Sequence, residues 1–478
     1  MGALFRKAWI RGRASPTTTE ERLRPLPGIL RMQSARLFAQ TVDRRNSGEA
    51  PMKSRERRLA EKGNCEAVRI KAILALSILV LEVHAAYAVS ASISPRWVGS
   101  WAAAEQTLEK NASEGEFRDA SLRQIVHLSI GGTRLRIRIS NTFGLSPLHL
   151  TSVHVARPFS PGDSRVDIAT DKALTFRGMG DVTVPPGAEY VSDAIVFSAG
   201  PLSDLAITFH LLEVPQQTTG HSDSRATAFL AKGDSVSAGD MAEAKKLEHW
   251  YFLSGVDVAA PANASSIVIL GDSITDGHTA SLNANDRWTD QLALRLHDFP
   301  ATRERAVLNE GIGGNRLLLD GLGPNALARF DRDVLAQPGV RYLILLEGIN
   351  DLGTLTMDGE VSPADHHALV LRILVAYLQM IVRAHDRGIK VIGATLMPYA
   401  GTPYYKASAA SEADRQAINQ WIRAPGHFDA VIDFDRAMRD PSRPDHILPA
   451  FDSGDHIHPS PKGYLAMSNA VPIRIFSR

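Results

Sequence analysis

Apolar residues follow two different patterns along this chain, and the change comes near residue 261. Between about 97 and 252, apolar and polar positions alternate in short runs that Pro, Gly, Ser and Asp separate. The run 133–140 shows this most clearly, because Leu135, Ile137 and Ile139 fall on one face. This pattern predicts β-strands. We expect them at residues 122–130, 133–140, 148–156, 182–184, 194–197 and 205–211.

The turns between these runs favour an all-β domain. Gly131-Gly132 separates the first two runs, which predicts a β-hairpin at that point. Several short strands without a helical period are typical of a β-sandwich. We therefore expect residues 89–255 to form an all-β sandwich domain.

Beyond residue 261, continuous apolar runs alternate with helical patterns. The expected strands are 266–270, 306–308, 342–346, 390–395 and 430–434. The expected helices are 288–296, 363–386, 412–423 and 462–470. Buried strands alternating with helices predict a parallel sheet covered on both faces, so residues 262–478 are expected to form an α/β domain.

Charged residues are unevenly distributed along the chain, with a basic N-terminal segment and an acidic remainder. The net charge of the whole chain is +1, but residues 1–71 hold 17 basic and 7 acidic residues. The remainder therefore holds 36 basic and 45 acidic residues, a net charge of −9. A mildly acidic body argues against nucleic acid or an anionic membrane surface as the main partner.

The basic head contains a segment that resembles a secretory signal peptide. Arg69 and Lys71 precede the short apolar run 72–81, and Ala86-Tyr87-Ala88 follows as a cleavage site. We expect residues 1–88 to be removed, and the mature protein to be secreted or periplasmic without stable membrane insertion. A membrane anchor and an Arg-rich transit segment remain the alternatives.

About seventy residues precede that signal, which indicates a true start at Met52 or Val68. The single Cys65 lies upstream of the expected cut. The exported chain would then have no disulfide, no thiolate metal site and no cysteine nucleophile. The pair His366-His367 is expected on a helix surface and not at a metal.

Polar motifs stand at the ends of three predicted strands. Gly271-Asp272-Ser273 follows the first strand, Gly311 to Gly314 follow the second, and Asn350-Asp351 follow the third. The carboxyl ends of parallel strands share one edge of a sheet, so these motifs should meet there. Asp455 and His458 lie in a Pro/Gly-rich loop before the last helix, and this loop can reach the same edge.

Each motif taken alone has a structural alternative. Ser273 is a plausible helix N-cap, the glycines a tight turn, and Asn350-Asp351 turn residues. Taken alone, His456 and His458 would be expected on the protein surface. Arg316 breaks the G-x-G-x-x-G pattern, which disfavours a dinucleotide site. A second Gly-Asp-Ser at 233–235 follows no apolar strand, so we interpret it as a turn.

Taken together and in this order, the motifs resemble the four blocks of the SGNH (GDSL) hydrolase family over about residues 264–478. The resemblance implies a flavodoxin-like α/β/α fold that hydrolyses carboxylic esters. Ser273 would be the nucleophile, His458 its general base, and Asp455 the group that orients His458. The oxyanion hole would consist of the Ser273 and Gly314 N–H groups and the Asn350 amide.

Further residues match longer, two-domain enzymes of this kind. Asp272, Asp276, Arg287 and Asp351 are expected in the wall or scaffold of the site. The β-rich segment, with Trp97 and Trp101, resembles the accessory domain found ahead of such hydrolase domains. Its aromatic rings could stack on sugars, although burial in the core is the preferred interpretation.

The sequence thus predicts an exported two-domain serine esterase that needs no metal or organic cofactor. Its expected substrate is a small acyl ester on a carbohydrate or other small molecule. A lysophospholipase or a broad arylesterase is the second interpretation. A catalytically inactive carbohydrate-binding protein is the alternative from another class. Nothing in the sequence indicates the oligomeric state.

Overall fold

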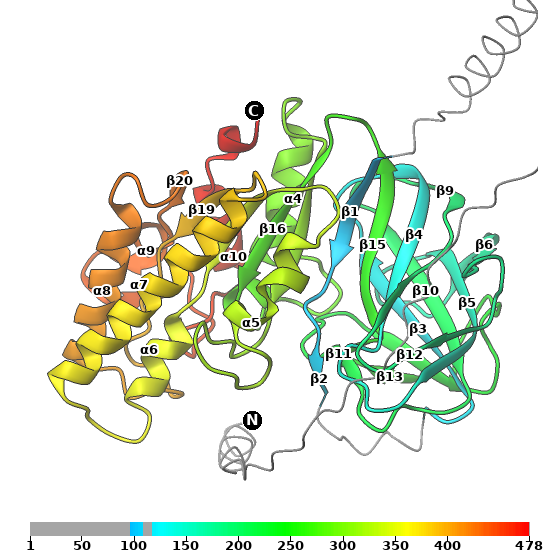
Figure 1. The fold of residues 1–478 in the computed structure, drawn as a ribbon, viewed down its shortest axis with the longest axis horizontal. Coiled ribbons are helices and arrows are strands. Elements are labelled where there is room, and N and C mark those ends of the chain that lie inside the picture. The colour runs from blue at the N-terminus through cyan, green and yellow to red at the C-terminus, as the bar shows by residue number, and fades with distance from the viewer. Residues whose placement is uncertain (1–95, 109–116, 478) are drawn as a thin grey trace, which may run out of the picture. The chain divides into compact units, whose positions relative to one another are not determined.

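The α/β part of the chain is built on one parallel sheet, and its strand order places the site. The structure, a computed structural model, describes residues 96–108 and 117–477 (Figure 1). The expected signal peptide, the alternative start sites and Cys65 lie outside the described residues. The described residues belong to one compact unit. The domain boundaries stay a prediction.

The parallel sheet has the strand order β17-β16-β18-β19-β20. In chain order this is 2-1-3-4-5, which is the flavodoxin-like arrangement that the resemblance implies. The strands are β16 (Ser265–Gly271), β17 (Arg305–Gly311), β18 (Val340–Leu346), β19 (Lys390–Ala394) and β20 (Ala430–Ile432). The helices are α3 (Ser273–Asp276), α4 (Trp288–Asp298), α5 (Ala326–Phe330), α6 (Ile349–Leu355), α7 (Pro363–His385), α8 (Ala409–Arg423), α9 (Phe434–Met438) and α10 (Pro461–Ala470).

Shorter elements complete this part. A π-helical turn (Asp331–Leu335) follows α5, a 3₁₀ turn (Ile473–Phe476) lies near the C-terminus, and β21 (Arg439–Asp440) pairs with β22 (Arg443–Ile447). The strand expected at 430–434 extends two residues too far at its C-terminal end, because β20 ends at Ile432. The Asp433 side chain accepts a hydrogen bond from the Arg436 N–H and caps α9, so the strand stops at Ile432.

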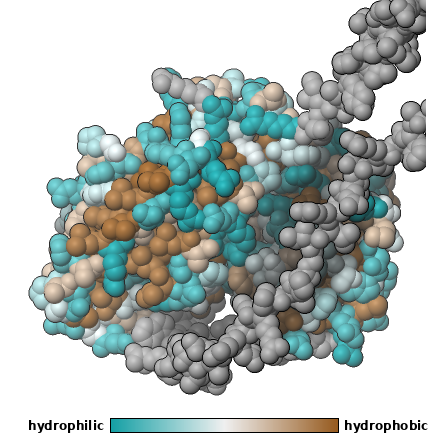
Figure 2. Space-filling model, viewed as in Figure 1, coloured by the Kyte–Doolittle hydropathy of each residue, from teal (hydrophilic) through white to brown (hydrophobic). Residues whose placement is uncertain are grey.

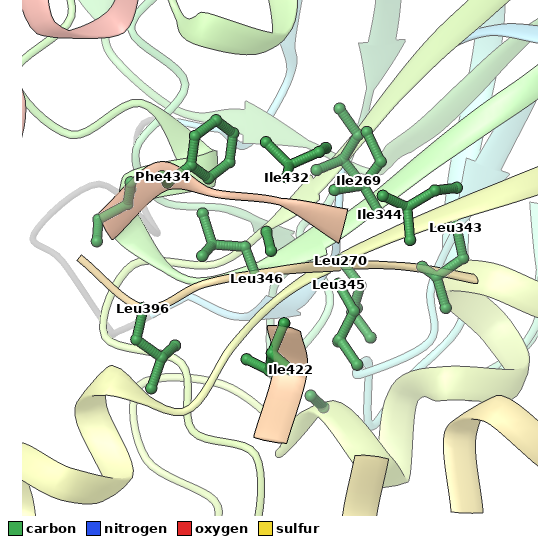
Figure 3. Packing of buried hydrophobic residues seen from close by; sticks show 14 of the residues in the cluster. Ile269, Leu270, Leu343, Ile344, Leu345, Leu346, Leu396, Ile422, Ile432 and Phe434 are labelled. Atoms are coloured by element: carbon green, nitrogen blue, oxygen red, sulfur yellow. The ribbon is translucent and has the colours of Figure 1, made fainter. Parts of the chain in front are cut away.

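Side chains of the parallel sheet alternate between its two faces and fill the core. Ile269 and Ile344 lie on one side of the sheet, and Leu270 and Leu345 lie on the other, near Ile422 of α8 (Figure 3). Every residue of β16 is buried. A strand covered on both faces needs this continuous apolar sequence, which explains the pattern seen at residues 266–270.

The N-terminal part is rich in antiparallel sheets, as the alternating pattern predicts; their stacking as a sandwich stays a prediction. One sheet contains β1 (Arg96–Ala102), β15 (Leu253–Ala260), β4 (Gly132–Ser140), β8 (Glu189–Val191) and β9 (Ile195–Ala199). The second contains β13 (Lys245–Leu247), β12 (Ala228–Lys232), β3 (Ala120–His127), β10 (Asp204–Leu211), β5 (Leu148–Pro158), β6 (Val166–Ala173) and β7 (Val182–Val184). A small third sheet contains β14 (Trp250–Tyr251), β11 (Thr219–His221) and β2 (Gln106–Thr107).

The expected hairpin at Gly131-Gly132 is wrong. Strand β3 pairs with β10 and β12, whereas β4 pairs with β15, β8 and β9 in the other sheet. The two glycines instead carry the chain from one sheet to the next. A Cβ atom on Gly131 would lie 2.5 Å from the Ala199 carbonyl oxygen, so this crossing demands glycine.

The β-rich part meets the parallel sheet along its edge strand β17. Ala103, just after β1, forms a parallel bridge with Asn309, and the Val307 N–H donates to Ser129 Oγ over 3.0 Å. An edge strand has unpaired backbone groups, and covering it satisfies part of them. The same contact brings β11 and the residues that follow it toward the carboxyl edge of the sheet.

Trp101 is buried and packs edge-on against Trp250, with ring centroids 4.9 Å apart. Its burial agrees with the interpretation that it belongs to the core. Trp97 is partly buried, and the Arg136 guanidinium lies 4.5 Å from the centre of its ring.

Candidate active site

The turn after β16 presents Ser273 at the edge of the sheet. Asp272 caps the single-turn helix α3, because its Oδ1 accepts a hydrogen bond from the Ile274 N–H over 2.9 Å. Ser273 is therefore the first helical residue, and the alternative that Ser273 itself is the cap is wrong. Gly277 ends α3 with a φ of +96°, a conformation that favours glycine.

Strand register brings the predicted motifs together. Gly271 stands beside Gly311 of β17 and beside Leu346 of β18. The neighbours of β16 in the sheet are β17 and β18, so the strand order reverses here, which is where ligands bind in open α/β sheets. Ser273, Gly314 and Asn350 all follow these three strand ends.

Ser273, His458 and Asp455 form a continuous chain of hydrogen bonds. Ser273 Oγ lies 2.8 Å from His458 Nε2, and His458 Nδ1 lies 2.6 Å from Asp455 Oδ2. The other oxygen, Asp455 Oδ1, accepts from the His458 N–H and from Ser453 Oγ. The serine and the histidine are buried, and the carboxylate is held by groups of its own loop.

The electrostatics favour a neutral histidine and an ionised aspartate. Burial lowers the pKa of His458 below its ordinary value, and its hydrogen bond to Asp455 opposes that shift. Burial would raise the pKa of Asp455, but the hydrogen bond and charge of His458 outweigh burial and hold it below its usual range. Neutral imidazole beside a serine hydroxyl can accept its proton.

Two of the three predicted donors of the oxyanion hole, the Gly314 N–H group and the Asn350 side-chain amide, lie near one another. Gly314 has a φ of +67° in a turn that the Asn315 N–H closes by donating to the Ile312 carbonyl. Asn350 lies in the first turn of α6, and its amide nitrogen donates to the Asn315 carbonyl over 2.7 Å. Asn350 therefore lies in a helix, and the alternative that it is a turn residue is wrong.

Tyr405 fixes the orientation of that amide. Its hydroxyl donates to Asn350 Oδ1 over 2.7 Å, so the amide nitrogen must face the other way. Both side chains are buried. The sequence did not indicate Tyr405, which lies 55 positions from Asn350 and belongs to no motif.

Asp351 holds the loop that follows Gly314 through hydrogen bonds to its backbone. Its two oxygens accept from the Leu317 N–H over 2.7 Å and from the Leu318 N–H over 3.0 Å. Burial raises its pKa to about 6, although these bonds lower it. Asp272 is a helix cap whose pKa burial raises to about 7. Asp272 and Asp351 thus hold the backbone of two loops of the site through hydrogen bonds.

Arg329 is a scaffold residue that the motifs did not reveal. Its guanidinium is fully buried and donates to the carbonyls of Gly271 and Glu310 and to Asn315 Oδ1. It thereby ties the ends of β16 and β17 to the loop beyond them. A buried charge of this kind is stable only when many acceptors surround it.

Asp276 and Arg287 connect the site with the β-rich part. Asp276 Oδ1 lies 2.8 Å from Nε2 of His221, which belongs to β11, and His221 Nδ1 lies 2.8 Å from the Ala104 carbonyl oxygen. Arg287 donates to the Asp276 carbonyl over 2.7 Å. Burial opposes the charged form of His221, but the Asp276 carboxylate outweighs it and raises the pKa of His221. His221 was not predicted.

A second histidine lies against the base. The ring centroids of His278 and His458 are 4.5 Å apart, and His278 Nδ1 lies 2.8 Å from Oδ2 of Asp223 in the β-rich part. The hydrogen bond to Asp223 raises the pKa of His278. The available sequence signal was the position of His278, five residues after Ser273.

Among the described residues, His278, Asp455 and His458 form the one cluster whose donor atoms could hold a metal ion, since these atoms lie within 4.8 Å of one another. His458 already hydrogen-bonds both Asp455 and Ser273 there. A cation at this place would therefore compete with the serine–histidine–aspartate chain.

Other predicted features are located as follows. His366 is buried and its Nδ1 hydrogen-bonds the Asp414 carboxylate of α8, so the expectation of a surface position holds only for His367. Gly233-Asp234-Ser235 lies in the loop after β12, with the Ser235 N–H donating to Ser121 Oγ over 2.7 Å.

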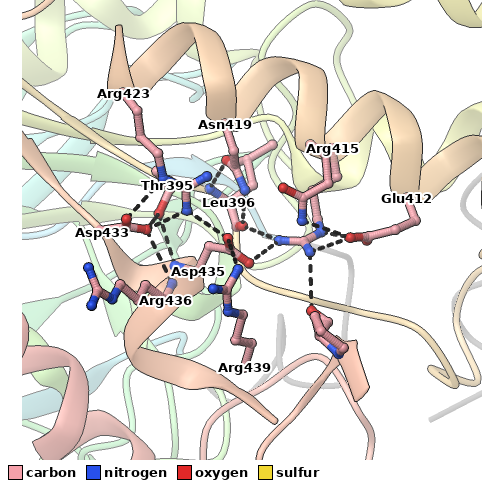
Figure 4. Close-up of polar contacts among 12 residues, drawn as sticks. Thr395, Leu396, Glu412, Arg415, Asn419, Arg423, Asp433, Asp435, Arg436 and Arg439 are labelled. Atoms are coloured by element: carbon pink, nitrogen blue, oxygen red, sulfur yellow. Dashed lines mark hydrogen bonds and ion pairs between the residues drawn. The ribbon is translucent and has the colours of Figure 1, made fainter. Parts of the chain in front are cut away.

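The loop that holds Tyr405 is anchored by a charged network between α8 and α9 (Figure 4). Arg415 donates to the Leu396 carbonyl over 2.8 Å and to Asp435 over 2.7 Å, and Asn419 donates to the same carbonyl. Arg415 and Asp435 are fully buried. The network fixes the chain as it leaves β19.

Comparison with known families decides the identity of the α/β part. Residues 269–466 match the model of the GDSL-like lipase/acylhydrolase family. This part of the chain is a GDSL-like acylhydrolase domain. The match contains Ser273, Gly314, Asn350, Asp455 and His458. The chain is accordingly a carboxylic ester hydrolase, as the sequence predicts.

Solved structures resemble this domain at low identity. A GDSL-like lipase from Bacteroides thetaiotaomicron VPI-5482 is 22% identical with a TM-score of 0.32, over 44% of this chain and 87% of that chain. An alpha/beta hydrolase enzyme from the metagenome of Lake Arreo is 22% identical with a TM-score of 0.33, over 46% and 98%. The aryl esterase of M. smegmatis is 17% identical with a TM-score of 0.33, over 45% and 99%. Comparison with curated proteins gives no match.

Proposed function

We propose that this protein is an exported serine esterase that removes small acyl groups, such as acetyl, from carbohydrate esters. The observation that carries the catalytic part is the hydrogen-bonded chain Ser273–His458–Asp455 at the switch point of the sheet. A geometry of this kind is what nucleophilic attack by serine requires.

The reaction follows from the positions of these groups. His458 Nε2 accepts the proton from Ser273 Oγ as the oxygen attacks the ester carbonyl carbon, and Asp455 stabilises the imidazolium that forms. The carbonyl oxygen, now negative, is stabilised by the N–H groups of Ser273 and Gly314 and by the Asn350 amide. His458 then protonates the departing alcohol oxygen. Water, activated by the same histidine, releases the acid from the acyl-serine.

The proposal of a carbohydrate substrate rests on the surroundings of the base. Tyr404 is partly exposed, and its ring centroid lies 5.9 Å from that of His458, edge to face. Asp223 and Arg225 supply charged groups on the side of His278. An aromatic ring among polar groups suits a sugar better than a long acyl chain.

Export is proposed from the sequence of the head, with its basic residues, apolar run and Ala86-Tyr87-Ala88. Expression of the full chain in a Gram-negative host, followed by N-terminal sequencing of the periplasmic fraction, tests it. A new N-terminus at Val89 supports export. An intact head retained in the membrane fraction supports an anchor.

The esterase is tested by hydrolysis of p-nitrophenyl acetate, butyrate and palmitate by the full chain and by its Ser273→Ala variant. We expect the variant to lose roughly three or more orders of magnitude in kcat/KM. The acetate ester should be the best substrate. Release of acetate from acetylated xylan beside fatty acid from lysophosphatidylcholine separates the carbohydrate esterase from a lysophospholipase. Equal trace activity in both proteins would favour a catalytically inactive carbohydrate-binding protein.

A further inference from the structure

Helix α7 has an apolar face on the outside as well as on the inside. Its inner face packs on the core of the sheet through buried residues such as Ile373, Tyr377 and Met380. A surface helix ordinarily presents polar residues on the opposite side. The outer face of α7 instead appears as an apolar patch on the left of Figure 2. Its large residues are Leu371, Val375, Leu378 and Val382, exposed by 49, 56, 42 and 55%.

The spacing of this outer face is regular. Ala364, Ala368, Leu371, Val375, Leu378 and Val382 follow one another at alternating intervals of four and three residues, and all six are exposed. We call these six residues the α7 seam. A mean spacing of 3.5 residues is the heptad pattern with which one helix packs against another.

The charge of the flanking residues distinguishes a helix partner from a membrane surface. An interfacial helix presents a broad apolar face and a basic polar face to the bilayer. The exposed polar residues beside the α7 seam, Asp365, Arg372 and Gln379, are of mixed charge and do not form a basic face. The length and composition of α7 would suit a membrane span, but nearly half of that apolar window is buried in the protein. Both observations favour a protein partner with a matching helix.

We propose that α7 is a homodimer interface in which the α7 seam packs against the same seam of a second copy of this chain. The seam supplies its own complement, because Leu and Val alternate along it and can interlock across a two-fold axis. The inference depends on the surface of α7 and not on the proposed esterase activity.

The surface area that two α7 helices can bury determines how stable the proposed dimer should be. A helix of 23 residues is about 34 Å long and about 10 Å wide, so two such strips bury roughly 700 Å² in total. Stable interfaces bury about 1,200 Å² or more, which makes this a weak and reversible dimer. Dissociation in the micromolar range is the expectation, and the assay must span it.

Sedimentation velocity of the full chain between about 1 and 100 µM tests the proposal. The weight-average mass should rise from monomer toward dimer over that range. The variant Leu371→Glu/Leu378→Glu should remain monomeric throughout, with unchanged thermal unfolding and esterase activity. The control Leu465→Glu changes a leucine of α10 that is 46% exposed, and it should dimerise like the parent.

Cross-linking locates the contact. Val375→Cys in a Cys65→Ser background should give a covalent dimer with a short bis-maleimide. Ile168→Cys on β6, with the same 56% exposure, should not. A parent that is monomeric at the highest concentration and shows no Val375→Cys cross-link would overturn the proposal. So would binding of the monomer to phosphatidylcholine vesicles that the double Glu variant abolishes, since the seam would then be a lipid-binding face.

Discussion

His278 should set the pH at which the base becomes active. Ester hydrolysis needs neutral His458, so kcat/KM rises with pH as this ring loses its proton. The positive charge of His278 lowers the pKa of His458 and extends activity toward acid. Replacing His278 by Asn removes that charge. The pKa of His458 then rises, and the acid limb of the profile moves to higher pH.

The size of this shift follows from the geometry. Two unit charges 4.5 Å apart, the distance between the two ring centroids, repel by about 1 kcal/mol in water and about 4 kcal/mol at an effective dielectric of 20. Asp223, which binds His278 over 2.8 Å, cancels much of that repulsion. Asp455 and Asp276 also face His278 and support its charge. We expect a net shift of about 0.5 to 1 pH unit.

The assay is kcat/KM for p-nitrophenyl acetate from about pH 4.5 to 8.5, with the apparent pKa fitted to the acid limb. His149→Asn is the matched control, because His149 of β5 also pairs with an aspartate, Asp181, over 2.7 Å. It should leave the limb in place. If the apparent pKa of the acid limb is unchanged or lower in His278→Asn, the electrostatic coupling of the two histidines is refuted.

Three further outcomes are expected. Tyr405→Phe removes the hydrogen bond that orients Asn350, so kcat should fall about tenfold with KM nearly unchanged; a change in KM alone would contradict this role. Zn²⁺ should inhibit by binding at the cluster around His278, with recovery on adding EDTA and weaker inhibition in His278→Asn; equal inhibition of both proteins would exclude the cluster. Arg415→Met leaves Asp435 buried without its partner, so thermal or urea unfolding should show a loss of about 3–5 kcal/mol; a loss below about 1 kcal/mol would mean that other groups compensate.

The α/β part was predictable because its signals are local. Continuous apolar runs located the buried strands, and the polar motifs at their ends located the site. Boundaries moved where a side chain caps a helix. Ser408 accepts from the Ser411 N–H, so α8 begins at Ala409 and not at residue 412.

The remaining site residues depend on contacts that no local pattern encodes. His221 and Asp276 are 55 positions apart, as are Asp223 and His278. Both pairs exist because β1 lies beside β17 and carries the β-rich part to the carboxyl edge. The hairpin at Gly131-Gly132 failed for the same reason, since the partners of β3 and β4 are distant in sequence.

Covalent labelling tests most directly that Ser273 is the nucleophile. The full chain would be treated with a fluorophosphonate, and intact mass and peptide mapping would locate the adduct. We expect one adduct per chain on Ser273, none in Ser273→Ala, and much slower labelling in His458→Ala. An adduct on Ser235 of the second Gly-Asp-Ser, or no adduct in a protein that hydrolyses esters, would contradict the assignment.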